Sequence, residues 1–374
     1  MERPTQPLRV LQLNSMFSGG GVDNQTLELS QALQERGHSI TLAVAAGSRW
    51  EPRAQALRPG IRVESFPGKS PLRSALMRTV IRLLRRDRCQ ILHIHQGRDY
   101  WPGIIAAKLA FCSTRVVITR HLMTRPRGFS RRFLLRMAHI LPVSQAVQRV
   151  LESELVGDHH RLHHVPGGID IDRFKPLCQA DGEAIRRHHH WSTEHVVFGV
   201  VGMYEPPRGK GQFEFLEAAV RVLKIHPNAR FVLVGQGGLR SEIEQFLARE
   251  HITDRVTLTG FTENMPAVMS ALDVLVHPTT GTEAFPLVIL EAMASAKPVI
   301  ASNLDGIPEQ ITEGQEGFLV PKTDVAALAE RMSQLAADPG LRSRMGQQGH
   351  QLVSHCFTRH HLGENTERIY RAIL

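Results

Sequence analysis

The chain has few cysteines and no long apolar run. Its 374 residues include four cysteines, which lie far apart and form no C-x-x-C pair. A disulfide framework and a zinc site are therefore not expected, and the cysteine usage fits a reducing cytoplasm. No segment approaches the roughly 20 apolar residues of a membrane-spanning helix, and the N-terminus does not resemble a signal peptide. We expect a protein of the cytoplasm, either free or held peripherally at the inner membrane face.

Aromatic residues are also scarce, at 6% of the chain, whereas basic residues are in excess and give a net charge of +9. Residues 1–175 hold 27 Lys and Arg against 13 Asp and Glu, a balance of +14, and residues 176–374 hold 18 against 23, a balance of −5. Arginines concentrate in two runs, 71–88 and 125–136. Aromatic residues do not alternate with them as a row of stacking platforms would, so nucleic acid is not the expected partner. An anionic membrane surface and an ordinary solvated helix both fit the first run.

Short apolar runs alternate with helical patterns along the whole chain. Seven strands are predicted in the first half, at residues 8–14, 39–45, 61–66, 90–95, 115–119, 140–143 and 162–165. Six are predicted in the second half, at residues 195–201, 230–234, 256–259, 274–277, 298–301 and 317–320. Such alternation predicts an α/β fold with parallel sheets and helices on both faces.

The pattern restarts near residue 195, after a polar and His-rich stretch. We therefore predict two doubly wound, Rossmann-like domains over residues 1–175 and 176–355. A final helix, 356–374, is predicted to pack back onto the first domain. Ligands of such sheets bind outside the carboxyl ends of the strands, so the predicted site is the cleft between the two domains.

Two carboxylates, Glu283 and Glu291, interrupt the apolar stretch 282–294. Charged side chains are seldom buried without a partner, so both glutamates need an explanation. Pro286 suits the first turn of a helix, because the N–H that proline lacks would be unpaired there. Glu283 is then expected in the loop before this helix, and Glu291 inside it.

The first N–H groups of that helix, those of Leu287 and Val288, have no partner within the helix and form an anion site. Carboxylates bind paired sugar hydroxyls well, because each can accept two hydrogen bonds. A phosphate site with a carboxylate on either side suits a ligand with hydroxyls at both ends and phosphates in its middle. A nucleoside diphosphate sugar has that shape.

Glu283-x7-Glu291, followed by Ala-Met-Ala, resembles the signature of the family-four retaining glycosyltransferases of GT-B fold. The resemblance extends over nearly the whole chain, in order and in spacing. Its other pieces are Phe17-Ser-Gly-Gly-Gly-Val22, Thr119-Arg-His121, Pro142-Val-Ser144, the run 165–176, Val201-Gly-Met203, Gly209-Lys-Gly211, the run 233–238, the run 258–261, Gly306-Ile-Pro-Glu309 and the run 317–321.

The resemblance implies a hexosyltransferase that moves a sugar from a nucleotide donor to a glycan or lipid-linked acceptor, in cell-surface polysaccharide or lipopolysaccharide biosynthesis. It implies retention of the anomeric configuration. A UDP-sugar is the donor expected first, and it is a substrate, so no cofactor is expected. No metal is implied either, because two cationic side chains and a helix N-terminus can replace Mg²⁺.

By the same resemblance, Glu291 binds the ribose hydroxyls and Glu283 faces the donor sugar. Lys210 neutralises the diphosphate with the help of Arg208, and His121 contacts the donor sugar near the bond that breaks. The other residues expected at the donor are Gly19, Gly20, Gly21, Gly235, Phe261, Phe285, Leu287 and Val288.

The chain departs from the family at Met203, where many members have an arginine, and Arg208 is the expected replacement. Two other functions stay open. A nucleotide-sugar epimerase would share the architecture and act on the donor alone. A non-catalytic nucleotide-sugar-binding protein would bind the donor without turnover.

Overall fold

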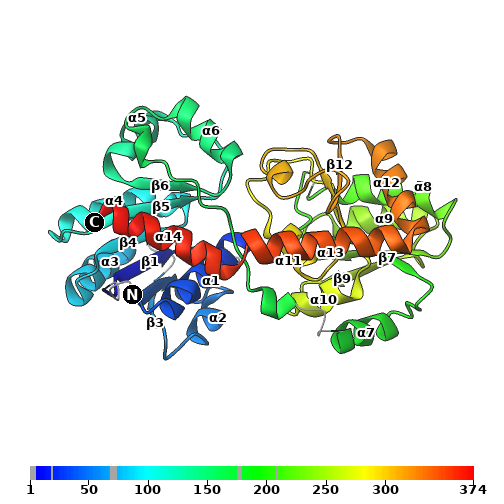
Figure 1. Cartoon of the computed structure of the whole chain (residues 1–374), viewed down its shortest axis with the longest axis horizontal. Coiled ribbons are helices and arrows are strands. Elements are labelled where there is room, and N and C mark those ends of the chain that lie inside the picture. The colour runs from blue at the N-terminus through cyan, green and yellow to red at the C-terminus, as the bar shows by residue number, and fades with distance from the viewer. Residues whose placement is uncertain (1–5, 18–19, 68–73, 175–178, 208) are drawn as a thin grey trace. The chain divides into compact units, whose positions relative to one another are not determined.

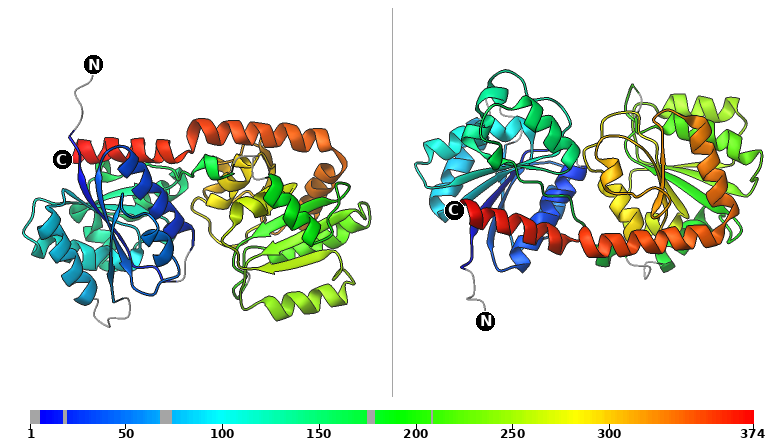
Figure 2. Two further views of the ribbon diagram at one scale, coloured as in Figure 1. Left: turned by 90° about the horizontal axis from the view of Figure 1, so that it is seen from below. Right: turned by 45° about the horizontal axis from the view of Figure 1, so that its top comes forward.

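The computed structural model describes residues 6–17, 20–67, 74–174, 179–207 and 209–374. The chain divides into two compact units (Figure 1). Unit 1 consists of Met1–Ile169 together with Arg359–Leu374, and unit 2 consists of Asp170–Thr358. Each unit is a six-stranded parallel sheet with helices on both faces (Figure 2). The predicted α/β class with two doubly wound sheets is therefore confirmed.

Unit 1 has the strand order β3-β2-β1-β4-β5-β6. Its strands are β1 (Arg9–Asn14), β2 (Ser39–Ala45), β3 (Arg62–Phe66), β4 (Ile91–Ile94), β5 (Arg115–Arg120) and β6 (His139–Pro142). Its α-helices are α1 (Gly21–Glu35), α2 (Glu51–Gln55), α3 (Ser74–Asp87), α4 (Tyr100–Leu109), α5 (Gly128–Met137), α6 (Gln145–Glu154) and α14 (Arg359–Ile373). Two 3-10 turns are η1 (Gly97–Asp99) and η2 (His159–Arg161).

Unit 2 has the strand order β12-β11-β10-β7-β8-β9. Its strands are β7 (Val196–Val201), β8 (Ala229–Val234), β9 (Val256–Gly260), β10 (Val274–His277), β11 (Val299–Ser302) and β12 (Gly317–Val320). Its α-helices are α7 (Gln179–His188), α8 (Gln212–Leu223), α9 (Arg240–Arg249), α10 (Met265–Ala271), α11 (Leu287–Ala294), α12 (Val325–Ala337) and α13 (Pro339–Cys356), and its 3-10 turns are η3 (Ile171–Phe174) and η5 (Ile307–Glu309).

Twelve of the thirteen predicted strands are present, and the strand predicted at 162–165 is wrong. That segment makes a single bridge, from Leu162 to Ile140, and the N–H of Val165 donates to the carbonyl of Pro142 at 3.1 Å. It follows the edge strand β6 for a few residues without forming a ladder. The segment is apolar because it packs on the hydrophobic core of unit 1, to which Val165 belongs.

The strand order of each sheet reverses beside its first strand, which fixes where a ligand can bind. In unit 1 the reversal lies between β1 and β4, and in unit 2 it lies between β7 and β10. Loops that leave the carboxyl ends of two such neighbouring strands turn away to opposite faces and leave a crevice. The loops that follow β7 and β10 are therefore expected to form the ligand site of unit 2.

Helix α14 completes unit 1, although unit 2 separates it from the rest of that unit in sequence (Figure 1). It packs on α1, and Leu362, Ile369 and Tyr370 belong to the hydrophobic core of unit 1. At its start, the Arg359 side chain pairs with Glu28 at 2.9 Å, and the Arg359 N–H donates to the carbonyl of Ile169 at 2.7 Å. The points where the chain leaves and re-enters unit 1 are thus joined by a hydrogen bond.

Within the described residues, no helix is both long enough and apolar enough to cross a membrane.

Candidate active site

Lys210 and Glu283 meet at the strand reversal of unit 2. Lys210 lies in the loop after β7 and Glu283 in the loop after β10, and the ammonium Nζ pairs with the carboxylate Oε1. The Glu283 side chain is only 11% exposed, whereas that of Lys210 is 39% exposed. The carboxylate is therefore fixed in the wall of the crevice, and the lysine has room to move.

His277, the last residue of β10, is a third member of this group. Its Nε2 lies 3.4 Å from the same Glu283 oxygen, and its side chain is buried. Burial alone would raise the pKa of the Glu283 carboxyl, but the neighbouring His277 and Lys210 outweigh it and lower that pKa to about 2. Glu283 is thus ionised at any physiological pH. Sequence reasoning placed His277 inside an apolar strand and missed it; its position at the carboxyl end of that strand was the available signal.

Backbone contacts hold both loops in place. The Glu283 N–H donates to Oδ2 of Asp305 at 3.0 Å, and its carbonyl accepts from the Gly306 N–H at 3.1 Å. Gly211, directly after the lysine, has φ +84°, and a Cβ there would lie 2.0 Å from the carbonyl oxygen of Pro278. Only glycine permits this approach, so the sequence Lys-Gly brings the lysine loop against the chain that leaves β10.

Helix α11 follows Glu283 and begins without a side-chain cap. Pro286 precedes its first residue, and the next amide of the helix to be paired is that of Ile289, which donates to the Pro286 carbonyl at 3.3 Å. The N–H groups of Leu287 and Val288 are among those that an α-helix leaves without an internal partner. Glu291 lies one turn further along and is buried. Of the positions predicted at the donor, 210, 283, 287, 288 and 291 therefore all lie on the loops and the helix beside one strand reversal.

The other predicted donor residues of unit 2 differ in their surroundings. Phe261 follows β9 and is 60% exposed. Phe285 packs against Phe357, with ring centroids 5.6 Å apart. Gly235 follows β8 with φ +143°, and a Cβ there would lie 2.2 Å from the Gly202 carbonyl oxygen, so close backbone packing accounts for this glycine. Arg208 lies outside the described residues.

The predicted residues of unit 1 are the glycine loop and His121. Gly20 precedes α1 and Gly21 is its first residue, with no atom within 4 Å of a Cβ built at either position. Gly19 lies outside the described residues. His121 follows β5, and burial lowers its pKa to about 3, so its imidazole is neutral. These residues belong to unit 1 and the Lys210 group to unit 2, and the roles predicted for both sets remain predictions.

The fold and the site define a two-domain α/β protein whose second unit places an uncapped helix start near a lysine. Comparison with known families agrees. Residues 19–173 match the family described as Glycosyltransferase Family 4, and residues 195–338 match the family described as Glycosyl transferases group 1. The chain belongs to the family-four glycosyltransferases of GT-B fold, as the sequence motifs predicted.

Curated relatives are glycosyltransferases of low sequence identity. A phosphatidyl-myo-inositol mannosyltransferase of Mycobacterium tuberculosis is 26% identical over 344 residues, which cover 87% of this chain and 86% of the relative. An Escherichia coli enzyme named UDP-Gal:alpha-D-GlcNAc-diphosphoundecaprenol alpha-1,3-galactosyltransferase is 25% identical over 276 residues, 70% of each chain.

Solved structures share the fold. HepE of Anabaena, in complex with UDP and glucose, superposes with a TM-score of 0.84 at 22% identity, over 98% of this chain and 100% of that one. A glycosyltransferase from Rickettsia africae superposes with a TM-score of 0.86 at 18% identity, over 99% of each chain.

Proposed function

We propose that this glycosyltransferase moves a hexose from a nucleoside diphosphate sugar to a lipid-linked acceptor, with retention of the anomeric configuration and without a metal ion. The observation that carries the proposal is the Lys210–Glu283 pair beside the uncapped start of α11. The names of the two curated relatives supply the lipid part, because both name a lipid as the acceptor. UDP is the first nucleotide to test, because it is named for the Escherichia coli relative and is bound in HepE.

Lys210 and Glu283 form an ion pair whose partners a bound donor would replace. When the donor binds, Lys210 turns to the phosphates, together with the amides of Leu287 and Val288, and Glu283 is free to accept hydrogen bonds from sugar hydroxyls. Glu291, one turn into α11, takes the ribose hydroxyls.

The same groups favour bond breaking. As the bond between the anomeric carbon and the phosphate oxygen breaks, negative charge grows on the diphosphate, and the Lys210 ammonium and the helix start stabilise it. The acceptor hydroxyl attacks on the face that the diphosphate leaves, which retains the configuration. The acceptor proton passes to a phosphate oxygen of the departing nucleoside diphosphate.

Incubation with UDP-, GDP- and ADP-sugars tests the donor. We expect one of them, UDP-sugars first, to raise the melting temperature by several degrees, since a ligand at 100 times its Kd adds about 2.7 kcal/mol of stability. With a polyprenyl-diphosphate sugar as acceptor and a chelator present, the product should carry an α-linked hexose by NMR when the donor is α-linked.

Three results would change the proposal. Conversion of the sugar nucleotide into an epimer without any acceptor would make the protein an epimerase. Stabilisation by a donor without turnover on any acceptor would make it a nucleotide-sugar-binding protein. Loss of all transfer in chelator, with recovery on adding a divalent cation, would overturn the metal-free part.

The proposed acceptor requires a surface that can approach a membrane, and we propose the α4–α5 face of unit 1 for this role. The apolar members of this α4–α5 surface are Ile105, Leu109, Phe111 and Phe129, which are 45, 46, 86 and 60% exposed. Phe129 also contacts the ring of Trp101, at 4.6 Å between centroids. The sequence has no Asp or Glu from residue 100 to residue 151, but nine Lys and Arg. Exposed apolar and basic side chains without carboxylates are typical of a surface that binds anionic lipid.

The first basic run is a weaker candidate for that role. On α3, Arg82 and Arg86 pair with Glu64 at 3.6 and 2.8 Å, and Arg85 donates to the carbonyl of Leu109 at 2.9 Å. Much of its charge is therefore used within the protein, as expected of a solvated helix over a core. Residues 71–73 of this run lie outside the described part of the chain.

Vesicle binding separates the two arginine groups. On vesicles of anionic phospholipid at low salt, the double variant Arg132→Gln/Arg136→Gln on α5 should bind roughly tenfold or more weakly than the unmodified protein, since each basic residue near such a surface contributes about 1 kcal/mol. The matched variant Arg78→Gln/Arg82→Gln on α3 removes the same charge and should bind within about threefold of the unmodified protein. Equal losses in both variants would reject the α4–α5 surface.

A further inference from the structure

A row of buried polar side chains crosses the centre of the unit 1 sheet. Gln12 lies on β1, His93 on β4, His95 directly after β4, and Thr119 on β5. All four are more than nine-tenths buried. His93 and His95 are two residues apart and so share one face of the sheet. Their rings stack with centroids 4.4 Å apart and planes inclined by 27°.

Helix α14 contributes to this row through Tyr370, whose side chain is fully buried. The Tyr370 hydroxyl lies 2.5 Å from Nδ1 of His93, and Oγ1 of Thr119 lies 2.6 Å from Nε2 of the same ring. A neutral imidazole has one donor and one acceptor nitrogen, so two hydroxyls can satisfy both. Together they hold the His93 ring at both edges.

The stack continues from His95 to His121. Nε2 of His95 lies 2.6 Å from the carboxamide oxygen of Gln12, to which it donates. The His121 ring follows, at 6.1 Å between centroids and an inclination of 34°. Within the described residues, Nε2 of His121 is buried without a hydrogen-bond partner. Packing against the His95 ring is thus a contact that can orient the His121 imidazole.

All three rings stay uncharged at neutral pH. Burial lowers the pKa of His93 and of His121 to about 3, and holds the pKa of His95 well below its usual value. Burial also raises the pKa of the Tyr370 hydroxyl, which keeps its proton. Neutral rings can stack without mutual repulsion, so the row is stable as a rigid support.

We infer that Tyr370 is a positioning residue: its hydroxyl, brought in by α14, fixes the His93–His95 stack against which His121 is oriented. This inference rests on the proposed function, in which His121 contacts the donor sugar. Without the hydroxyl, Nδ1 of His93 is left buried and unpaired, and the ring can tilt or change its tautomer. The tilt passes through His95 to His121, which then meets the sugar in a less productive direction.

Tyr370→Phe in the full chain tests the inference, because it removes one oxygen and keeps the ring. We expect kcat for transfer to fall about tenfold, with the KM for the nucleotide sugar within about twofold, because the diphosphate residues lie in unit 2. In protein with ¹⁵N-labelled histidine, the ring-nitrogen signals of His121 should shift along with those of His93 and His95.

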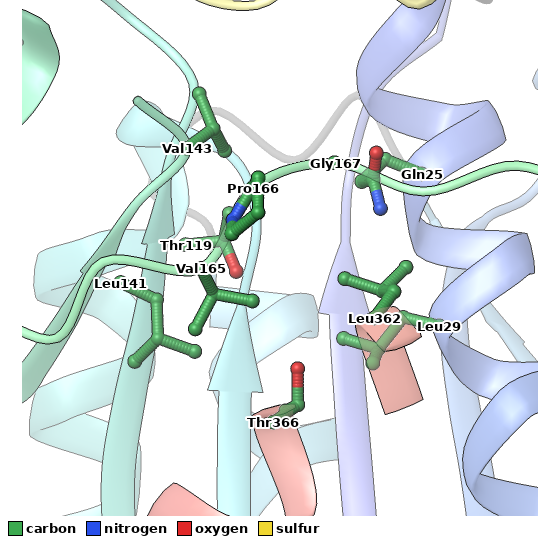
Figure 3. A pocket seen from close by; sticks show the side chains of 10 residues that line it. All are labelled: Gln25, Leu29, Thr119, Leu141, Val143, Val165, Pro166, Gly167, Leu362 and Thr366. Atoms are coloured by element: carbon green, nitrogen blue, oxygen red, sulfur yellow. The ribbon is translucent and has the colours of Figure 1, made fainter. Parts of the chain in front are cut away.

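A second variant acts on the opposite edge of His93. Thr119→Val also removes a hydroxyl while keeping the size of the side chain, and Thr119 lines a small pocket of unit 1 (Figure 3). It should lower kcat and move the His121 signals as Tyr370→Phe does, whereas Thr119→Ser, which keeps the hydroxyl, should restore both. Ile369→Val is the control on α14, since it trims the same hydrophobic core and removes no hydrogen-bonding group.

Unchanged His121 signals in both hydroxyl-deleted variants, or a loss of kcat no larger than that of Ile369→Val, would overturn the inference. The NMR result is independent of catalysis. If the unmodified protein transferred no sugar, the proposed function would fail, while the signals would still show whether Tyr370 orients His121. If Tyr370→Phe does not fold, Thr119→Val and Thr119→Ser decide the question.

Discussion

Lys210→Ala is expected to lower the rate of sugar transfer by roughly 100- to 1,000-fold, the loss found when one preorganised partner of a developing charge is removed. The Nζ of Lys210 is a cation at the strand reversal of unit 2 with enough freedom to turn to a diphosphate. The start of α11 remains in the variant, so some stabilisation of the leaving group persists. Initial rates with saturating donor and acceptor measure the effect.

The matched control is Lys224→Ala. Lys224 is exposed at the far end of α8, the helix that begins just after Lys210, and its removal changes the net charge equally. It should leave the rate within about twofold. The fold of Lys210→Ala should survive, because the Lys210 side chain is partly exposed and His277 still lies 3.4 Å from the Glu283 carboxylate. A rate near that of the unmodified enzyme would remove Lys210 from the diphosphate site.

Glu283→Gln should reduce kcat/KM by roughly 10- to 100-fold, because hydrogen bonds to a charged group contribute about 1.5–3 kcal/mol. Glutamine keeps the size of the side chain but loses the charge that faces Lys210 and His277. Free Lys210 is then a stronger ligand for phosphate, so product release of the nucleoside diphosphate should slow as well. Inhibition of transfer by UDP measures that second effect.

Glu283→Gln should also change how the stability of the folded protein depends on pH. The pKa of Glu283 is lowered to about 2 in the folded protein, so its ionised form stabilises the fold above the unfolded value near 4.5, and this contribution is lost as the pH falls from about 4.5 to 2. Glu283→Gln should flatten the acid side of the unfolding curve over that interval. Glu244→Gln, which breaks an exposed surface pair with Arg240, is the control. An equal effect of both on kcat/KM would contradict the role of Glu283.

Much of the fold was predictable because the strands and helices of a parallel α/β sheet alternate in a regular pattern along the sequence. Most strands are largely apolar and buried, and a helix such as α1 ends shortly before a glycine, Gly37, with φ +86°. The error at 162–165 has the same origin. A segment that packs Val165 into the core looks like a strand, and only its position beside β6 decides that it makes a single bridge.

The sequence allowed the candidate site residues to be named, but it did not allow the contacts between them to be predicted. Glu283 and Lys210 are 73 positions apart, and their meeting depends on β7 and β10 being neighbours, which no local pattern encodes. His277 was missed because a histidine inside an apolar strand reads as core. The arginines of α3 could not be assigned from sequence either, since their partner Glu64 comes from β3.

Because α14 completes the core of unit 1, the two units can finish folding only in a certain order during synthesis. Ribosomes synthesise residues 1–169 first, but the core of that unit still lacks Leu362, Ile369 and Tyr370. The whole of the intervening unit must emerge before these side chains exist. Part of the apolar surface of unit 1 therefore stays uncovered until α14 has been made, and unit 2 can fold before unit 1 is complete.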